Sequence, residues 1–333
     1  MKKTIAFCIT AMLILFSLAG CKEGKQPLKT VRLNEVVHSV FYAPQYVAVE
    51  KGFFKDEGLD IQLSVGQGAD KSMTALLSGS ADVALLGTEA GIYVYNEGSR
   101  DYAKPFCQLT QRAGNFLVAR EAMPNFKWTD LKGKEIIGGR KGGMPEMLLE
   151  YILKQNGIDK NKDVEIINNI SFESTAGAFS AKQGDFTAEF EPTASALEKS
   201  GAGYVVASLG KDSGYVPYTV YMARKSLIKS DPELLQHFTN AVYKAQKWTN
   251  EHSAADIADA IAPDFKESDK DSLIKIIERY KEQDTWKTNP LFEEKSLDLI
   301  EDIMENGGEL EKRVPYSEYI DTQFAKSAID NVK

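Results

Sequence analysis

Short apolar runs alternate with helical periods along most of the chain, and this alternation limits the possible folds more than any other feature. Six helical periods lie between the apolar runs, at 43–51, 70–78, 89–96, 145–155, 174–182 and 193–199. Ten apolar runs are typical of strands, at 31–36, 61–65, 83–87, 106–110, 116–120, 135–138, 164–168, 186–190, 204–208 and 218–223. Strands that alternate with helices form mostly parallel sheets with helices on both faces. The chain is therefore predicted to be an α/β protein.

A weak internal repeat divides this pattern into two halves. The residues "DIQL" from Asp60 resemble "DVEI" from Asp163, and "ADVALLG" from Ala81 resembles "GDFTAEF" from Gly184. Both pairs have the same offset of 103 residues. A shared offset predicts two similar α/β lobes, which begin near residues 31 and 133.

The last third of the chain is predicted to be helical. For "SDPELLQHFTNAVYKAQKW" we expect Ser230 to cap the helix, with Pro232 in its first turn and Glu233 completing a capping box. Further helices are expected at "SDKDSLIKIIERY", at "EEKSLDLIEDIM", which Gly307 and Gly308 close, and at "PYSEYIDTQFAKSAI".

The amino terminus predicts export. Lys2 and Lys3 precede an uncharged apolar stretch that reaches Gly20, which is the pattern of a secretory signal and is short for a membrane span. The "LAGC" at 18–21 resembles the lipobox of bacterial lipoproteins, whose signal peptidase cuts before an acylated cysteine. We expect residues 1–20 to be a signal peptide, Cys21 to carry a membrane-anchoring lipid, and residues 21–30 to be a polar tether. An ordinary membrane anchor is the alternative, and it would also place residues 22 onward outside the cytoplasm.

Charge and cysteine content further limit what kind of exported protein this can be. Loss of Lys2 and Lys3 with the signal peptide changes the formal net charge from −8 to −10, because the first twenty residues hold no acidic residue. An acidic exported protein without a basic stretch has no electrostatic surface for nucleic acid. If Cys21 carries lipid, Cys107 has no partner for a disulfide within the mature chain. Stability must then come from a large core, and 43% hydrophobic residues can supply one.

A glycine-rich turn, "IIGGRKGG" at 136–143, raises the question of nucleotide binding. Gly138 and Gly143 have the spacing of a phosphate-binding loop, but Met144 and Pro145 occupy the positions that need Lys and Ser or Thr. A strand, a turn and a helix that begins near Pro145 remain. Free N–H groups at that helix start favour an anionic or strongly accepting ligand group, and a plain linking turn is the alternative.

Other catalytic patterns are missing from the sequence. His38, His237 and His252 lie in unrelated segments without HExxH or Cys-x-x-Cys partners, so we expect no metal site. No G-x-S-x-G motif occurs, and Cys107 lies in an apolar run, where a buried small residue is expected. We expect neither a cofactor nor an enzymatic activity.

Several motifs together resemble the solute-binding proteins of ABC importers for nitrate, sulfonate, taurine and thiamine precursors, the SsuA-like family. The resemblance begins with "YAPQYVAVEKGFFKDEGLDIQLSVGQGADKSMTALLSGSADVALLG" and continues through "TDLKGKEIIGGRKGG", "AKQGDFTAEFEPTASALEK" and "VPYSEYIDTQFA". It covers the chain from about Val31 to the end. It implies a two-lobed type II periplasmic-binding-protein fold, which closes on a small solute and delivers it to the membrane permease of an ABC importer.

The resemblance also implies that the chain crosses twice between the lobes. We expect the crossings near Arg112 to Asn115 and near Tyr218 to Val220. The first lobe would then comprise residues 31–113 plus 221–333, and the second lobe residues 114–220.

The solute should lie where the carboxyl ends of the strands of the two lobes face each other. The turn before Pro145 supplies candidate ligand-binding residues from the second lobe. The offset of 103 residues identifies the equivalent positions in the first lobe. The crossings add Arg112 and Asn115. The candidate ligand-binding residues are His38, Ser39, Tyr42, Thr88, Glu89, Arg112, Asn115, Arg140, Gly142, Gly143, Met144, Glu191 and Tyr218. For the two glutamates a helix-capping role is the alternative, and His38 can either titrate near pH 6.5 or donate to a turn carbonyl.

The balance of these residues favours one class of solute. Two carboxylates near Phe41, Tyr42 and Tyr218 suit a flat heterocycle with amino groups, such as a pyrimidine-like thiamine precursor. An anion of the sulfonate, taurine or nitrate type is the first alternative, and it would use Arg140, Lys141 and Arg112. A pyrimidine-synthesising enzyme on the same fold is the second, but the export signal and the missing cysteine-rich motif of those enzymes argue against it. A sensor or adhesin on the same scaffold is the third.

Overall fold

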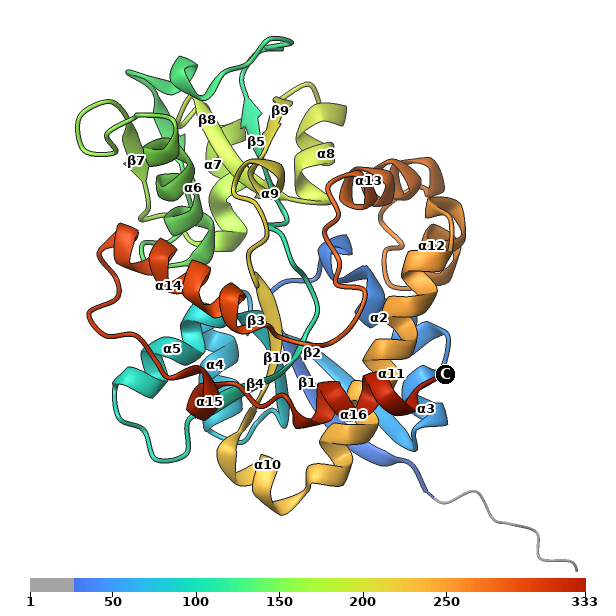
Figure 1. The fold of residues 1–333 in the computed structure, drawn as a ribbon. Helices are drawn as coiled ribbons and strands as arrows, with labels where there is room; N and C mark the ends of the chain where they lie inside the picture. Colours follow the sequence, from blue (N-terminus) through green and yellow to red (C-terminus); the bar gives the residue numbers. More distant parts are fainter. Residues whose placement is uncertain (1–26) are drawn as a thin grey trace, which may run out of the picture.

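The computed structural model describes residues 27–333, in which ten strands form two five-stranded sheets (Figure 1). The signal peptide, Cys21 and residues 21–26 of the expected tether lie outside the described residues. Within residues 27–333, no helix combines the length and the apolar character needed to span a membrane.

Both sheets have the same architecture, and each defines one lobe. The first lobe contains, in spatial order, β2 (Leu59–Val65), β1 (Lys29–Glu35), β3 (Val83–Gly87), β10 (Thr219–Arg224) and β4 (Ala103–Gln108). The second contains β7 (Glu165–Ile167), β6 (Glu135–Ile137), β8 (Phe186–Phe190), β5 (Asn115–Ala119) and β9 (Tyr204–Ser208). In each sheet one strand, β10 or β5, runs antiparallel to both neighbours, while the remaining pairs are parallel. The predicted α/β class with mostly parallel sheets is confirmed.

The internal repeat corresponds to this duplicated architecture. β3 and β8 lie at equivalent places in their sheets and are offset by 103 residues, from Val83 to Phe186. The residues that follow these two strands therefore occupy equivalent positions at the carboxyl ends of both sheets, where a shared cleft can form.

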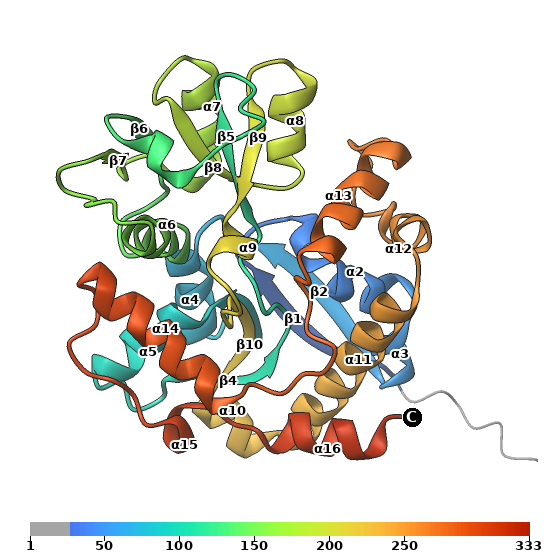
Figure 2. The ribbon, with the colours of Figure 1, turned by 45° about the horizontal axis from the view of Figure 1, so that its top comes forward.

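Two segments connect the lobes. The first joins the end of β4 at Gln108 to Asn115, and the second joins the end of β9 at Ser208 to Thr219. Figures 1 and 2 show both segments running side by side between the sheets. The second crossing was expected to return to the first lobe at residue 221. β10 already pairs with β3 from Thr219, which lies opposite Gly87, so the chain rejoins the first-lobe sheet two residues earlier.

Helices cover both sheets. In the first lobe they are η1 (Val40–Tyr42), α2 (Ala43–Glu50), α3 (Phe53–Asp56), α4 (Ala69–Leu77) and α5 (Thr88–Asn96). In the second lobe they are η2 (Trp128–Leu131), α6 (Met144–Gln155), η3 (Phe172–Ser174), α7 (Thr175–Ser180), α8 (Thr193–Lys199) and α9 (Leu209–Asp212). Glycine or proline stands at or next to the start of α4, α5, α6 and α8, as expected where a strand turns into a helix.

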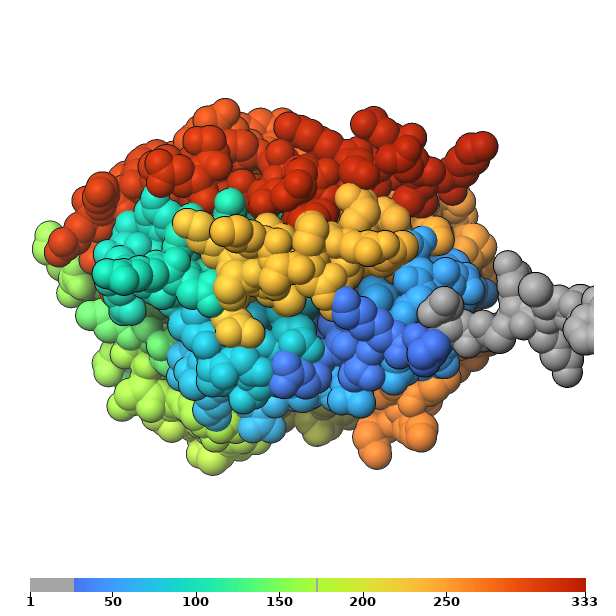
Figure 3. Space-filling model, turned by 90° about the horizontal axis from the view of Figure 1, so that it is seen from below, coloured from blue at the N-terminus to red at the C-terminus, as the bar shows by residue number. Residues whose placement is uncertain are grey.

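The remaining helices wrap around the first lobe. They are α10 (Lys225–Ser230), α11 (Pro232–Glu251), α12 (Ala254–Ile261), α13 (Lys270–Glu282), α14 (Glu294–Gly307), α15 (Tyr316–Tyr319) and α16 (Gln323–Asn331). α11 packs against α2 and α3, whereas α14 packs against both α5 and α6 and so touches both lobes. Seen from below, the C-terminal residues in red extend across the whole width of the molecule (Figure 3).

Two details of the predicted helices were wrong. Asp231, not Ser230, caps α11, because it directly precedes Pro232 and its carboxylate accepts a hydrogen bond of 3.3 Å from Leu234 N–H. The helix expected at "PYSEYIDTQFAKSAI" is split into α15 and α16, because Asp321 N–H donates to the carbonyl of Pro105 instead of continuing the helix. The predicted closure of α14 is confirmed, since Gly308 adopts a left-handed conformation with φ of 79°.

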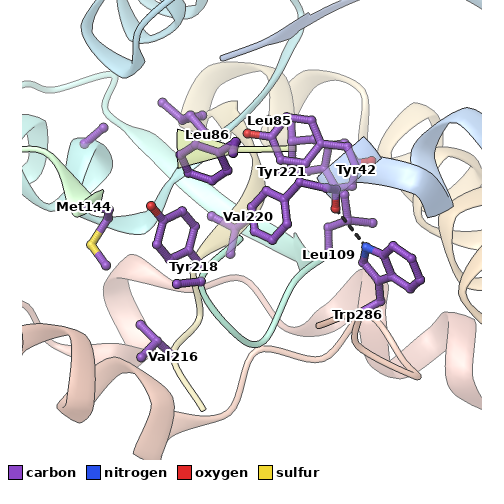
Figure 4. Packing of buried hydrophobic residues seen from close by; sticks show 14 of the residues in the cluster. Tyr42, Leu85, Leu86, Leu109, Met144, Val216, Tyr218, Val220, Tyr221 and Trp286 are labelled. Carbon is purple, nitrogen blue, oxygen red and sulfur yellow. Dashed lines mark hydrogen bonds between the residues drawn. The ribbon is translucent and has the colours of Figure 1, made fainter. Parts of the chain in front are cut away.

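The core reaches into the space between the lobes. Figure 4 shows Leu85, Leu86, Val220 and Tyr221 of the first sheet packed near Tyr42 and Tyr218. The indole N–H of Trp286 donates a hydrogen bond of 2.8 Å to the carbonyl of Phe41 (Figure 4). This bond attaches the segment after α13 to η1.

Candidate ligand-binding site

Two adjoining cavities open between the lobes. We call the first, of about 170 Å³, the aromatic cavity, because Tyr42, Phe190 and Tyr218 line it. We call the second, of about 320 Å³, the glutamate cavity, because Glu173, Glu189 and Glu191 line it. Four residues line both cavities: Val37, Gln67, Glu173 and Phe190. One ligand can therefore contact both.

The aromatic residues that line the aromatic cavity are buried. Phe190 comes from β8 of the second lobe and lies 6.1 Å from the ring of Tyr218, which directly precedes β10 of the first lobe. Phe41, which lines neither cavity, packs edge-on against Tyr218, with ring centroids 5.6 Å apart. The hydroxyl of Tyr218 is buried and has no hydrogen-bond partner within residues 27–333. Such walls suit a flat apolar ligand that also carries a polar group.

Glu89 is the buried carboxylate of the aromatic cavity. It lies in the first turn of α5, is 3% exposed, and its Oε2 has no hydrogen-bond partner in the described part of the chain. Burial raises the pKa of Glu89 to about 7, although the N–H groups of Glu89 and Met144 and the cation of Arg140 favour the charged form. Gly87 permits this placement, because a Cβ there would lie 2.1 Å from Oε2.

The glycine turn of the second lobe faces the same cavity. Gly142 adopts φ of 69°, which favours glycine, and Gly143 caps α6. The N–H of Gly142 donates to the buried carboxylate of Glu146 at 3.0 Å. With Glu89 near the Met144 N–H, two carboxylates of the protein already face the N–H groups where an external anion was expected.

The cations of the aromatic cavity have partners from the opposite lobe. Arg140 lies 3.9 Å from Asp70, and Lys71 lies 4.0 Å from Glu173. These pairs are largely exposed, so each contributes little to stability. Glu89, by contrast, is a buried carboxylate of this cavity, and it has no ion-pair partner within 4.0 Å among the described residues.

Glu189 on β8 is a buried carboxylate of the glutamate cavity that was not among the site residues predicted from the sequence. Its oxygens accept hydrogen bonds from Thr175 Oγ1 at 3.1 Å and Thr187 Oγ1 at 2.7 Å. Burial raises the pKa of Glu189 to about 7, and the two hydroxyls only partly oppose this. An acidic residue inside the otherwise uncharged run "FTAEF" was the available signal, because a charge in a buried strand is rarely without a role.

Comparison with known proteins identifies the family. A model described as the NMT1-like family matches residues 24–262. The Bacillus subtilis (strain 168) protein YtlA, provisionally described as a binding protein, is 47% identical over 319 residues, which cover 96% of this chain and 95% of YtlA.

The chain belongs to the NMT1-like family.

Solved structures share the fold of this NMT1-like chain. The alkanesulfonate-binding protein SsuA from Xanthomonas axonopodis pv. citri, bound to MOPS, has a TM-score of 0.71 at 16% identity, covering 89% of this chain and 99% of that one. The ligand-binding component of an ABC-type import system from Staphylococcus aureus, with zinc bound, has a TM-score of 0.72 at 17% identity, covering 90% and 99%. The predicted likeness to SsuA-like proteins and the two-lobed periplasmic-binding-protein fold are confirmed.

The structure brings most of the predicted site residues of the NMT1-like chain to the cavities. Tyr42, Glu89, Arg140, Gly143, Met144 and Tyr218 line the aromatic cavity, and His38 and Glu191 line the glutamate cavity. Figure 4 shows Tyr42, Tyr218 and Met144 within the packing between the lobes.

Five predicted residues line neither cavity. Thr88 Oγ1 donates to the carbonyl of Pro217 at 2.6 Å, and Arg112 Nη1 donates to that of Gly210 at 3.0 Å. The amide of Asn115 is buried at the start of β5 without a hydrogen-bond partner in residues 27–333. The other two, Ser39 and Gly142, make contacts between the lobes.

His38 and Glu191 have several partners within the protein. His38 Nδ1 lies 3.0 Å from Glu35 Oε1, and this interaction raises the pKa of His38. The carboxylate of Glu191 accepts from Ser195 N–H at 2.9 Å, at the start of α8, and forms an ion pair with Arg279. Glu191 thus has the helix-capping role that was its alternative.

Contacts between the lobes surround the cavities. Ser39 Oγ donates to the carbonyl of Glu191, and Tyr93 OH donates to that of Gly142 at 2.9 Å. Arg279 also pairs with Glu198 at 3.1 Å. Contacts at or next to residues that line each cavity therefore join the two lobes.

Proposed function

We propose that this protein is an extracytoplasmic solute-binding lipoprotein, which captures a small solute between its lobes and delivers it to the permease of an ABC importer. Membership of the NMT1-like family and the two-lobed fold support this function. The export signal and the lipobox of residues 1–21 support a lipid anchor on Cys21. A Cys21→Ser variant is then expected to leave the membrane fraction of the cells that express it.

The proposed solute is a flat heterocycle with amino groups, of the pyrimidine-like thiamine-precursor kind. One observation carries this proposal: the buried carboxylate of Glu89, with its unpartnered Oε2, lies in a cavity walled by aromatic rings. A ring between Phe190 and the tyrosines would gain apolar contact, and an amino group on it would donate to Glu89. The free hydroxyl of Tyr218 could donate to a ring nitrogen.

An anion of the sulfonate, taurine or nitrate type is less well supported. Such a ligand would need the N–H groups of α6 and the guanidinium of Arg140. Glu89 and Glu146 already face those N–H groups, and Asp70 lies near Arg140. An added anion would meet these carboxylates at short range in a poorly solvated space, where repulsion between like charges is strong.

An enzymatic role also has little support from the geometry. Cys107, the one cysteine among residues 27–333, is buried in β4 and lines neither cavity. Burial raises the pKa of its thiol well above the ordinary value, so it is a poor nucleophile.

The proposal is tested by native mass spectrometry of the protein expressed from Lys22 onward, followed by denaturation and identification of any released molecule. An aminopyrimidine or another aminated heterocycle is the expected result. A sulfonate or a similar anion would instead assign the ligand contacts to Arg140 and the start of α6.

A further inference from the structure

Glu189 is a buried carboxylate without a cation. It is 5% exposed, and no Lys, Arg or His nitrogen lies within 4.0 Å of it among the described residues. Its two hydrogen bonds come from threonine hydroxyls, which leave each oxygen able to accept more. Buried carboxylates are normally paired, so this one is suited to a donor from outside the protein.

The place of Glu189 makes such a donor reachable from the proposed site. Glu189 and Phe190 both line the glutamate cavity, and Phe190 also lines the aromatic cavity. A solute stacked on Phe190 in the aromatic cavity can therefore extend an arm into the glutamate cavity. The glutamate cavity has space for that arm, since its volume of about 320 Å³ exceeds that of its neighbour.

Glu191 and Glu173, the other carboxylates of the glutamate cavity, are less available. Glu191 already accepts from Ser195 and pairs with Arg279, and Glu173 is exposed near Lys71. Glu189 is thus the one buried carboxylate lining this cavity that has no ion pair among residues 27–333.

We propose that the solute has a second amino or ammonium group on a short arm, and that Glu189 binds this group while Glu89 binds the ring. This inference rests on the proposed function, because it names a second feature of the same solute. It makes Glu189 the residue that selects aminated arms over neutral ones, since a carboxylate and an ammonium group form a charge-assisted hydrogen bond that a neutral arm cannot form.

Two matched probes test the inference without knowledge of the natural solute. The probes are 4-amino-2,5-dimethylpyrimidine, with a neutral arm, and 4-amino-5-aminomethyl-2-methylpyrimidine, which adds only the arm's amino group. Titration calorimetry of the protein expressed from Lys22 onward is expected to show at least about tenfold tighter binding of the second probe. Glu189→Gln should remove this difference and leave the affinity for the neutral-arm probe within about threefold of the wild-type value.

Glu165→Gln is the control, because it removes an exposed carboxylate of the same sheet that lines neither cavity. It should change neither affinity by more than about threefold. A thermal unfolding curve for each variant checks that the fold is intact.

Each other outcome overturns the inference in a distinguishable way. Equal affinity of the wild-type protein for both probes would show that Glu189 receives no arm, even if the variant did not fold. If Glu189→Gln lowered the affinity for both probes equally, Glu189 would have only a structural role. Failure of the wild-type protein to bind either probe would instead overturn the aminated-heterocycle function itself, and the inference with it.

Discussion

The hydroxyl of Tyr93 donates a hydrogen bond of 2.9 Å to the carbonyl of Gly142, so α5 of the first lobe is bonded directly to the turn before α6 of the second. The carboxylate of Glu89, on the same helix, faces the Met144 N–H at the start of α6. α5 and the start of α6, which border the aromatic cavity, are thus joined by one hydrogen bond and by one buried carboxylate. This relationship couples the binding site to the relative position of the lobes.

We predict that Glu89→Gln weakens the binding of an aminopyrimidine by about 10- to 100-fold. The amide has nearly the shape of the carboxylate but loses the charge, and a charge-assisted hydrogen bond is worth about 1.5–3 kcal/mol. Titration calorimetry measures the loss. Glu97→Gln, an exposed change just after the same helix, is the control and should have no effect. Unchanged affinity in Glu89→Gln would remove Glu89 from the binding site.

We also predict that Glu89→Gln stabilises the ligand-free protein more at pH 8 than at pH 5. The pKa of Glu89 is about 7 in the folded protein and lies near its ordinary value of 4.5 in the unfolded chain. The folded state therefore binds more protons between these values, and the free energy of unfolding falls as pH rises from about 4.5 to 7. Removing the titrating group should raise that free energy by up to about 3 kcal/mol at pH 8. Chemical denaturation at the two pH values measures the difference, and an equal effect at both would refute the assignment.

We predict that lobe closure depends on Tyr93. Tyr93→Phe removes one hydrogen bond between the lobes, worth about 0.5–1.5 kcal/mol, and should weaken solute binding about threefold to tenfold. Small-angle scattering should show a smaller radius of gyration when solute is added to the wild-type protein, and a smaller change in the variant. Tyr95→Phe is the matched control, since its hydroxyl donates to Glu318 rather than to the second lobe. Identical scattering profiles with and without solute would exclude closure.

We predict that Arg279→Met destabilises the protein by about 3 kcal/mol. The change leaves the fully buried carboxylate of Glu191 without its cation, and an unpaired buried charge is costly. Denaturant unfolding measures this loss. The control is Arg313→Met, because Arg313 pairs with Asp302 and Glu305 on the surface and should contribute less than about 1 kcal/mol. Similar values for the two variants would mean that the Glu191 carboxylate finds another partner or is solvated.

The sequence alone was sufficient to predict the strands, most of the helices and the duplicated lobes. The run at 83–87 and its counterpart at 186–190 are strands at the predicted positions, and α6 begins within one residue of its predicted start. These features depend on apolar periodicity and on glycine or proline near element ends, which act over a few neighbouring residues. The offset of 103 residues then predicted that the same arrangement of strands and helices occurs twice, once in each lobe.

Only the tertiary structure decided which acidic side chains face the ligand cavities and which have partners. Glu191 and Glu189 are two residues apart on the same strand end, yet Glu191 pairs with Arg279, 88 residues away, whereas Glu189 has hydroxyl partners but no cation among the described residues. The burial and charge state of a carboxylate depend on groups brought close by folding, and these groups leave no mark in the neighbouring sequence. The sequence by itself therefore determined the frame of the site, and long-range packing determined its chemistry.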